Sequence, residues 1–404
     1  MSRGRELLAG AVLAGLGVAC AAAMLEVGVR WLHLVPDRFW RPDPVLGLRL
    51  IPGKDGWWTQ EDREFLVPVK VNAHGLRDVE HSYAKPPGTF RILVLGDSFV
   101  EAMHVPLEAA FPRVLERRLN ATHPSQRVEV IGAGVSGYGT ASELLYFERE
   151  GRRYQPDIVL LAFYPGNDVK NNSPTLEDVL KPVYAADGSL RRVVPAAAPR
   201  HSRGWRALLV RSAAYHYFRQ VLLVQHPHLA HSLAEYGLLR YEALRATSEH
   251  GGVPVDYGVY AASLQPEWRE AWRHTESLLQ ELRRVVTANG ARLVVAVLCA
   301  RDQIYPAWWR EVLAAHPRMQ SARWNLDAPQ RRVERWCAQH GVPCVALAAA
   351  FRAAAAHSGD VLHYHYDGHW TVAGHRLAAT VLQDFLEQHQ LVPSRQQGAK
   401  HEVH

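Results

Sequence analysis

Two short segments of this 404-residue chain carry the side chains of a nucleophilic triad. Ser98 follows Gly96 and Asp97, and much later in the sequence Asp367 and His369 are separated by one residue. Cleavage of an ester needs a hydroxyl nucleophile, a base that takes its proton and a group that orients that base. Ser98 is therefore the candidate nucleophile, His369 the candidate general base, and Asp367 the group that would orient the imidazole.

The same chemistry needs hydrogen-bond donors for the negatively charged oxygen of the tetrahedral intermediate. The candidate donors are the backbone N–H groups of Ser98 and Gly137 and the side-chain amide of Asn167. On its own, the Gly-Asp-Ser segment fits equally well a helix cap, in which Asp97 and Ser98 accept hydrogen bonds from backbone N–H groups. The further segments that supply a base, an orienting acid and oxyanion donors favour the nucleophile.

Strands that alternate with helices must position these residues. Residues 92–95 are all aliphatic and predict a buried strand that ends at Gly96. Further strands are predicted over residues 127–131, 156–163, 291–299 and 343–347. Helices are predicted over residues 101–119 (with an alternative start after Pro106), 141–150, 205–223, 268–288, 330–340 and 372–388. This alternation predicts a parallel sheet that is covered by helices on both faces, an α/β fold.

The predicted topology gathers the candidate residues at one edge of the sheet. Ser98, Gly137 and Asn167 each follow a predicted strand, and Asp367 and His369 follow the last one. The carboxyl ends of parallel strands meet at one edge, which is where open α/β sheets bind ligands. We therefore expect these five residues to lie close together.

The N-terminal region predicts a membrane segment. Residues 7–25 are 19 consecutive uncharged residues, which as a helix would be about 28 Å long, close to the hydrocarbon thickness of a bilayer. They predict a transmembrane signal-anchor within residues 1–30, with the bulk of the chain exported. A signal peptide that is cleaved near residues 19–23 is the alternative. Lipidation of Cys20 is a third possibility, although Gly17 stands where a lipoprotein cleavage site usually has Leu.

The rest of the chain divides into three predicted parts. Residues 31–88 are rich in Pro, Gly and Trp and form an N-terminal extension with an edge strand or hairpin over residues 65–72. Residues 89–392 form the main domain, which an insertion at about residues 170–265 interrupts, as a lid or a partner surface would. Residues 393–404 are polar and predict a disordered tail.

Composition and motif spacing exclude several functions. Hydrophobic residues make up 48% and charged residues 21%, as in an ordinary globular protein, and the net charge of +6 comes without a run of five Lys or Arg. We therefore expect no nucleic-acid partner. The four Cys residues lack the spacing of metal ligands. His363, His365, Asp367 and His369 alternate as a metal site in an extended segment would, but a metal site would leave Ser98 and Asn167 unexplained. No metal or cofactor is predicted.

Four short segments resemble the sequence blocks of the SGNH hydrolases, the GDSL-type esterase superfamily. They are Gly96-Asp97-Ser98, Val135-Ser136-Gly137-Tyr138-Gly139-Thr140, Gly166-Asn167-Asp168 and Asp367-Gly368-His369-Trp370, within residues 91–375. The family's catalytic positions map onto Ser98, Gly137, Asn167, Asp367 and His369. The resemblance implies a flavodoxin-like α/β/α sandwich with about five parallel strands and a carboxylic ester hydrolase or acyltransferase. Its implied substrate is a small-molecule, lipid or glycan ester, and the implied location is the bacterial inner membrane, with the catalytic domain on the periplasmic side.

Three positions depart from the family pattern. Phe99 stands where many members have Leu. The Asp-x-His spacing, instead of Asp-x-x-His, is similar to that of polysaccharide O-acetyltransferases of the alginate type. Gly132 stands where an Asn often opens the second block, so Gly134 is an alternative to Gly137 as an oxyanion donor. The function hypotheses are therefore a serine esterase, an O-acyltransferase that modifies an envelope polysaccharide, and a non-catalytic membrane-anchored assembly subunit.

Overall fold

The chain forms two compact units. The computed structural model describes residues 2–60, 62–176, 182–184, 190–193, 212–226, 229, 249–250, 253–357 and 359–393. The first unit comprises Met1–Arg38, Trp57–Leu66 and Ala197–Thr247, and the second comprises Phe39–Gly56, Val67–Ala196 and Ser248–His404. All the candidate site residues belong to the second unit.

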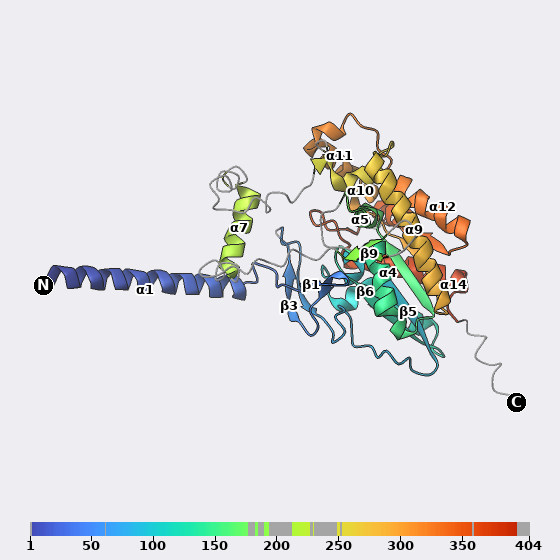
Figure 1. Ribbon diagram of the computed structural model, residues 1–404, viewed down its shortest axis with the longest axis horizontal. Helices are drawn as coiled ribbons and strands as arrows, with labels where there is room; N and C mark the ends of the chain where they lie inside the picture. Colours follow the sequence, from blue (N-terminus) through green and yellow to red (C-terminus); the bar gives the residue numbers. More distant parts are fainter. Residues whose placement is uncertain are drawn as a thin grey trace. The chain divides into compact units, whose positions relative to one another are not determined.

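A sheet of five parallel strands forms the centre of the second unit (Figure 1). Its strand order is β13-β12-β7-β5-β6, and every pair in it is parallel. The strands are β5 (Thr89–Gly96), β6 (Arg127–Gly134), β7 (Ile158–Phe163), β12 (Arg292–Val297) and β13 (Cys344–Ala346). The chain runs from β5 to β6 on one side and then crosses to β7 on the other, so the strand order reverses at β5. Crevices at such a reversal are where doubly wound sheets bind ligands.

Two layers of helices cover the two faces of the sheet. Side chains of β5 alternate, since Leu93 and Leu95 join one hydrophobic cluster and Ile92 and Val94 join the other. The first cluster includes residues of α4 (Thr140–Arg149), α9 (Pro266–Ala288) and α12 (Ala328–His340). The second includes residues of α3 (Phe111–Thr122), α13 (Ala348–His357) and α14 (Val372–Gln388). The predicted three-layer α/β/α fold is confirmed.

The helix predicted over residues 101–119 is wrong in its first half. The structure has a single turn, α2 (Ser98–Glu101), then η1 (Leu107–Ala109) and then α3. Ala102 ends α2 because its φ of 53° places it in the left-handed region, which cannot continue a helix. The carbonyl groups of this turn accept hydrogen bonds from the buried Arg77, a tertiary contact that local sequence does not reveal.

The glycine-rich segment after the second predicted strand is also different from the prediction. Residues 132–134 belong to strand β6 and not to the turn that follows it, since Gly134 pairs with Gly96 of β5. The N–H of Gly132 donates to Asp78 Oδ2 at 2.7 Å. A side chain at Gly134 would overlap α2, because an added Cβ would lie 2.4 Å from the backbone nitrogen of Glu101. Close packing against α2 therefore explains this glycine.

The N-terminal extension contributes short strands. β1 (Trp40–Asp43) and β2 (Gly47–Leu50) form an antiparallel hairpin. β4 (Leu66–Lys70) lies within the segment 65–72, and its burial alternates, with Val67 and Val69 facing inward. The other described elements are β3 (Asp55–Thr59), η2 (Gly151–Tyr154), α5 (Pro165–Asn171), β8 (Pro182–Tyr184), β9 (Leu190–Val193), β10 (Glu249–His250), β11 (Val253–Pro254), η4 (Val255–Tyr260), α10 (Arg301–Ile304), α11 (Pro306–Ala315) and η5 (Pro317–Met319).

Two helices characterise the first unit. α1 (Ser2–Trp31) is long and apolar enough to cross a membrane, with a mean hydropathy of 2.2 over its best window. α7 (Ala213–Gln225) covers the later part of the helix predicted over residues 205–223, and residues 205–211 lie outside the described residues. Much of the predicted insertion, and residues 394–404 of the predicted tail, also lie outside them.

Candidate active site

The turn between β5 and α2 presents Ser98. Gly96 is tightly enclosed, since an added Cβ would lie 2.4 Å from a side-chain carbon of Val100. Asp97 caps α2 by accepting a hydrogen bond from the N–H of Phe99 at 3.0 Å. Ser98 is thereby fixed as the first residue of the helix, at the carboxyl end of β5. Asp97 therefore caps the helix, and Ser98 also lies at the strand end where the candidate nucleophile was expected.

A continuous chain of hydrogen bonds joins the three predicted triad residues. The Nε2 atom of His369 lies 2.7 Å from Ser98 Oγ, and its Nδ1 lies 2.7 Å from Asp367 Oδ1. With the Nδ1 proton donated to the carboxylate, Nε2 is left to accept the proton of the serine hydroxyl. Asp367 Oδ1 also accepts from the backbone N–H of His369 at 3.1 Å. This is the arrangement that activates a serine hydroxyl.

Asp367, Gly368 and His369 lie in a tight turn that follows β13 and α13 in the chain. His363 and Trp370 form an antiparallel bridge, and the N–H of Tyr364 donates to the carbonyl of His369 at 2.8 Å. Gly368 lies between the acid and the base with a φ of 84°, a conformation that strains any residue with a Cβ. Glycine at this position therefore permits the short Asp-x-His form.

The electrostatics of the pair support an ionised Asp367. Burial raises its pKa, but the hydrogen bond and the charge of His369 outweigh burial and hold the pKa at about 2. Burial lowers the pKa of His369, and the hydrogen bond and charge of Asp367 more than offset this effect, so the pKa is raised. The imidazolium that forms when the base takes a proton is therefore stabilised by a carboxylate in direct contact.

The candidate oxyanion donors occupy different environments. Gly137 lies in the turn before α4 with a φ of 78° and open space around its Cα. Asn167 lies in α5, and its Nδ2 donates one hydrogen to Asp97 Oδ2 at 3.0 Å, which leaves the second amide hydrogen for another acceptor. Gly134, the alternative, is enclosed between β5 and α2. Of the two glycines, Gly137 is the one with space beside it.

A comparison with known protein families identifies the family of this chain. Residues 94–377 match the GDSL-like Lipase/Acylhydrolase family. The chain belongs to this family. The matched segment is more than half of the chain and contains all five candidate residues. No curated protein matches the chain.

Several solved structures are similar to this chain at low sequence identity. An α/β hydrolase enzyme from the metagenome of Lake Arreo, Spain, is 16% identical, with coverage of 78% of this chain and 100% of that one and a TM-score of 0.38. A two-domain esterase active on acetylated mannans is 13% identical, with coverage of 76% and 51% and a TM-score of 0.35. A mutant of an acetyl-xylooligosaccharide esterase from Geobacillus Stearmophilus is 12% identical, with coverage of 74% and 94% and a TM-score of 0.38. The GDSL-like hydrolase spans about half the length of the mannan esterase.

Three residues that sequence reasoning did not assign surround the triad of this GDSL-like hydrolase. His104 stacks on His369, with 3.7 Å between ring centroids and 13° between ring planes. The buried carboxylate of Glu101 accepts from Trp40 Nε1 at 2.8 Å and from the hydroxyl of Ser136, and burial raises its pKa to about 7. Arg77 is buried and donates to the carbonyls of Glu101 and Ala102 at the end of α2.

The alternating histidines do not form one cluster in this hydrolase. His363 is buried, with its Nε2 at 3.2 Å from the carbonyl of Cys299, and His365 lies 3.4 Å from Glu311. Side-chain donor atoms of His104, Asp367 and His369 do lie within 4.8 Å of one another. However, the two imidazoles are stacked, so their in-plane lone pairs run nearly parallel and do not converge on one ion.

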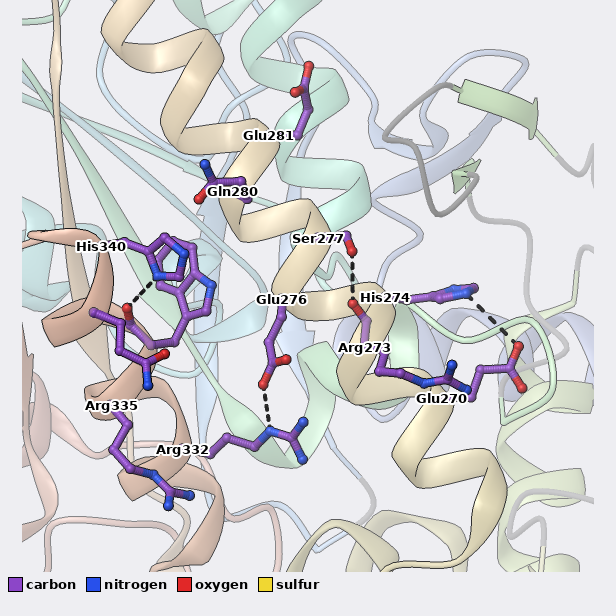
Figure 2. Close-up of a pocket in the computed structure, with 12 residues that line it drawn as sticks. Glu270, Arg273, His274, Glu276, Ser277, Gln280, Glu281, Arg332, Arg335 and His340 are labelled. Atoms are coloured by element: carbon purple, nitrogen blue, oxygen red, sulfur yellow. Dashed lines mark hydrogen bonds and ion pairs between the residues drawn. The ribbon is translucent and has the colours of Figure 1, made fainter.

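A large groove lies away from the triad. It has a volume of about 940 Å³ and lies between α9 and α12 (Figure 2). Its walls carry ion pairs such as Arg332 with Glu276 at 2.7 Å, and its serine, Ser277, donates to the carbonyl of Arg273 in its own helix. None of the triad residues lines this groove. This groove is therefore not where the hydrolase has its candidate nucleophile.

Proposed function

We propose that this GDSL-like hydrolase cleaves a carboxylic ester, an acyl or acetyl ester of a carbohydrate or lipid, through an acyl-enzyme on Ser98. The observation that carries this proposal is the hydrogen-bonded chain from Ser98 through His369 to Asp367, with both contacts at 2.7 Å. A serine hydroxyl is a weak nucleophile unless an adjacent base accepts its proton. In this arrangement the base is in contact and its far nitrogen is held by a carboxylate.

The proposed reaction has two halves. Ser98 Oγ attacks the ester carbonyl while its proton moves to His369 Nε2. The tetrahedral intermediate collapses to an acyl-serine ester, and the same proton passes to the leaving alcohol. A water molecule then gives a proton to His369 and attacks the acyl-serine, and the acid leaves as Ser98 recovers its proton. Asp367 stays ionised throughout, consistent with a pKa of about 2.

The proposed oxyanion site uses three donors. The backbone N–H groups of Ser98 and Gly137 and the Nδ2 amide of Asn167 would bind the negative oxygen of the intermediate. Asn167 is tied to Asp97, the residue immediately before the nucleophile, by a 3.0 Å hydrogen bond. This contact links the position of the amide to that of Ser98. Removing one donor of this kind typically costs about 3 kcal/mol of transition-state stabilisation.

The primary experiment compares Ser98→Ala with a matched serine variant. Ser277→Ala is the control, because Ser277 lies in the α9 groove and donates only within its own helix. We expect Ser98→Ala to abolish hydrolysis of p-nitrophenyl acetate and labelling by a fluorophosphonate probe, and Ser277→Ala to change neither. Full activity of the Ser98→Ala protein would refute the proposal. A folded wild-type protein that the probe does not label would favour a non-catalytic assembly subunit.

O-acyl transfer is the second candidate function. It uses the same acyl-serine, but a glycan hydroxyl attacks in place of water. The observation that favours it is the Asp-Gly-His turn, in which Gly368 at a φ of 84° allows the short spacing similar to alginate-type O-acetyltransferases. Incubation with an acyl donor and glycan acceptors, followed by mass spectrometry of the glycan, separates the two functions. Hydrolysis whose rate does not respond to any acceptor, with no acylated glycan, would count against transfer.

We propose that α1 is retained as an inner-membrane anchor and that the catalytic unit lies on the periplasmic side. The carboxylate of Glu26, in the last two turns of α1, accepts hydrogen bonds from Ser212 Oγ at 2.7 Å and from the first two N–H groups of α7 at 2.9 and 3.0 Å. Cleavage near residues 19–23 would leave Glu26 within the first few residues of the mature chain, where helices fray. Mass spectrometry of the protein from membranes tests this, since an N-terminus at residues 20–24 would refute retention.

A further inference from the structure

His104 makes the closest ring contact to the candidate general base. Its imidazole lies flat against His369, with ring centroids 3.7 Å apart and planes only 13° from parallel, a separation at van der Waals contact. Its Nε2 lies 3.7 Å from Asp367 Oδ1. Asp367 accepts one hydrogen bond from the backbone N–H of His369 and one from its ring, at Nδ1. One hydrogen bond from the ring to the carboxylate leaves the ring able to tilt about that contact. The stacked ring of His104 restricts this tilt.

Arg77 fixes the turn that carries His104. The side chain is buried, and it donates hydrogen bonds to the carbonyls of Glu101 at 3.1 Å, Ala102 at 2.6 Å and Val105 at 2.5 Å. These carbonyls lie on both sides of His104 in the sequence. A planar guanidinium can reach several acceptors in fixed directions, which a lysine ammonium cannot. The left-handed conformation of Ala102 thus has a buried support from the N-terminal extension.

Tyr364 ties the same turn to the segment of the catalytic base. Its hydroxyl donates to the carbonyl of His104 at 3.0 Å, and its backbone N–H donates to the carbonyl of His369 at 2.8 Å. One residue therefore holds the main chain of both histidines. The distance between the two stacked rings is set by this connection and by Arg77 together.

We propose that His104 is a positioning residue that covers one face of the His369 imidazole and keeps its Nε2 directed at Ser98. The inference rests on the proposed catalytic roles of Ser98 and His369. His104 acts as a neutral ring, because burial and the neighbouring His369 hold its pKa well below the usual value. By covering the base it also keeps water from one face of the imidazolium.

The charged surroundings of the two rings determine what a pH profile reports. The groups that act on His104 are His369, Asp367, His375 and Arg77. The groups that act on His369 are the carboxylates of Asp367, Asp97 and Glu101 and the imidazoles of His104, His363 and His375. Burial lowers the pKa of His369, so loss of the covering ring admits water and raises it. The acid limb of kcat/KM, which reports the free general base, would then move to higher pH.

The test measures hydrolysis of p-nitrophenyl acetate by the full-length protein in detergent, for His104→Ala, His104→Phe and Tyr364→Phe. We expect His104→Ala to lower kcat by on the order of 10- to 100-fold, as small misplacements of catalytic groups do, with KM little changed and the acid limb at higher pH. His104→Phe keeps a ring in the stack and should keep both kcat and the acid limb close to wild type. Tyr364→Phe removes only the hydroxyl that holds the carbonyl of His104 and should lower kcat, by less than His104→Ala does.

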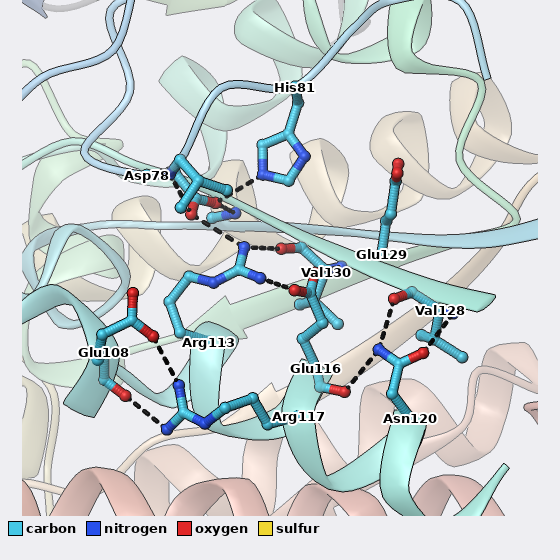
Figure 3. Close-up of polar contacts among 12 residues, drawn as sticks. Asp78, His81, Glu108, Arg113, Glu116, Arg117, Asn120, Val128, Glu129 and Val130 are labelled. Atoms are coloured by element: carbon cyan, nitrogen blue, oxygen red, sulfur yellow. Dashed lines mark hydrogen bonds and ion pairs between the residues drawn. The ribbon is translucent and has the colours of Figure 1, made fainter. Parts of the chain in front are cut away.

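Arg77→Lys and Arg113→Lys form a matched pair. Arg113 is also buried and donates to a strand carbonyl, that of Val130 at 3.1 Å, while it pairs with Asp78 and Glu116 (Figure 3). It supports α3 and β6 and not the turn that holds His104. We expect both variants to lower the melting temperature, and only Arg77→Lys to lower kcat per folded molecule.

Three outcomes would overturn the proposal. The first is an unchanged kcat and acid limb in His104→Ala. The second is equal loss of activity in His104→Phe and His104→Ala, which would show that the ring face is not what matters. If His104→Ala does not fold, Tyr364→Phe and His104→Phe decide, and wild-type kcat in Tyr364→Phe is the third contrary outcome. Failure of the proposed function is recognised separately, because it would appear as full activity in Ser98→Ala.

Discussion

Replacement of Asp367 by alanine tests the triad most directly. The carboxylate is almost fully buried, with 2% of its side chain exposed, and it accepts from Nδ1 of His369 at 2.7 Å. Its pKa is about 2, compared with an ordinary value of 3.8. Because a pKa difference of one corresponds to 1.36 kcal/mol, the carboxylate favours its ionised form beside His369 by roughly 2 to 3 kcal/mol. The same contact favours the protonated form of the base, because it raises the pKa of His369.

We expect Asp367→Ala to lower kcat/KM near neutral pH by on the order of 100-fold, the rate equivalent of roughly 2 to 3 kcal/mol. The acid limb of kcat/KM should move to lower pH. Burial lowers the pKa of His369 and Asp367 raises it, so loss of the carboxylate leaves burial as the larger effect. This shift of the acid limb to lower pH is opposite to the shift expected for His104→Ala, so one assay distinguishes the two variants.

The control is Asp157→Ala. Asp157 Oδ2 accepts from the backbone N–H of Arg91 at 2.7 Å and from Lys85, at the amino ends of β5 and β7 and thus at the opposite edge of the sheet. We expect this variant to lose stability and to keep the wild-type acid limb. An Asp367→Ala protein whose acid limb coincides with that of the wild type would refute the assignment of Asp367 to the base.

Two further predictions concern the surroundings of the triad. Asn167→Ala should lower kcat by on the order of 100- to 1,000-fold without a large change in melting temperature. Gly134→Ala should destabilise the fold, because its Cβ would lie 2.4 Å from the nitrogen of Glu101. The opposite pattern in activity and thermal unfolding would favour Gly134 as the donor. Burial raises the pKa of Glu101 from 4.5 to about 7, so between these values the folded state retains a proton that the unfolded state releases. The free energy of unfolding should therefore fall by up to roughly 3 kcal/mol as pH rises from about 4.5 through 7. Glu101→Gln should remove this part of the pH dependence in denaturant titrations, and an unchanged slope would contradict it.

The candidate triad was readable from the sequence because its chemistry coincides with strand ends. Ser98 follows the aliphatic residues 92–95 of β5, and Asn167 follows β7, so the rule that parallel strands share a carboxyl edge was sufficient to predict that they lie close together. The parallel sheet and its two covered faces followed from the alternation of strands and helices, whereas the strand order was not predicted. Site residues are easiest to predict when their type suits few reactions and when they directly follow a clearly predicted strand.

The turn after Ser98 could not be read in this way. The pattern of apolar residues over 101–119 fits a helix, and nothing local indicates that Ala102 has a left-handed conformation. That conformation depends on Arg77, which is distant in sequence and whose function is not visible from its own neighbours. His104 is missed for the same reason, because a lone histidine in an apolar segment carries no spacing signal. Helix α13, absent from the prediction, lies in an alanine-rich segment without polar alternation.

The structure places the support of the active site in the segment before the family's sequence blocks. Residues 39–56 and 67–88 belong to the same compact unit as the sheet, although residue 88 marks a change in composition. From this extension, Trp40 donates to the carboxylate of Glu101, and Arg77 holds the carbonyls of the turn that follows. Glu101 in turn accepts from Ser136, the neighbour of Gly137. The turn that carries Ser98, the turn that carries Gly137 and the segment that carries His104 therefore share supports, so their positions are coupled. A chain that began at the first block would keep every proposed catalytic side chain and lose the contacts that align them.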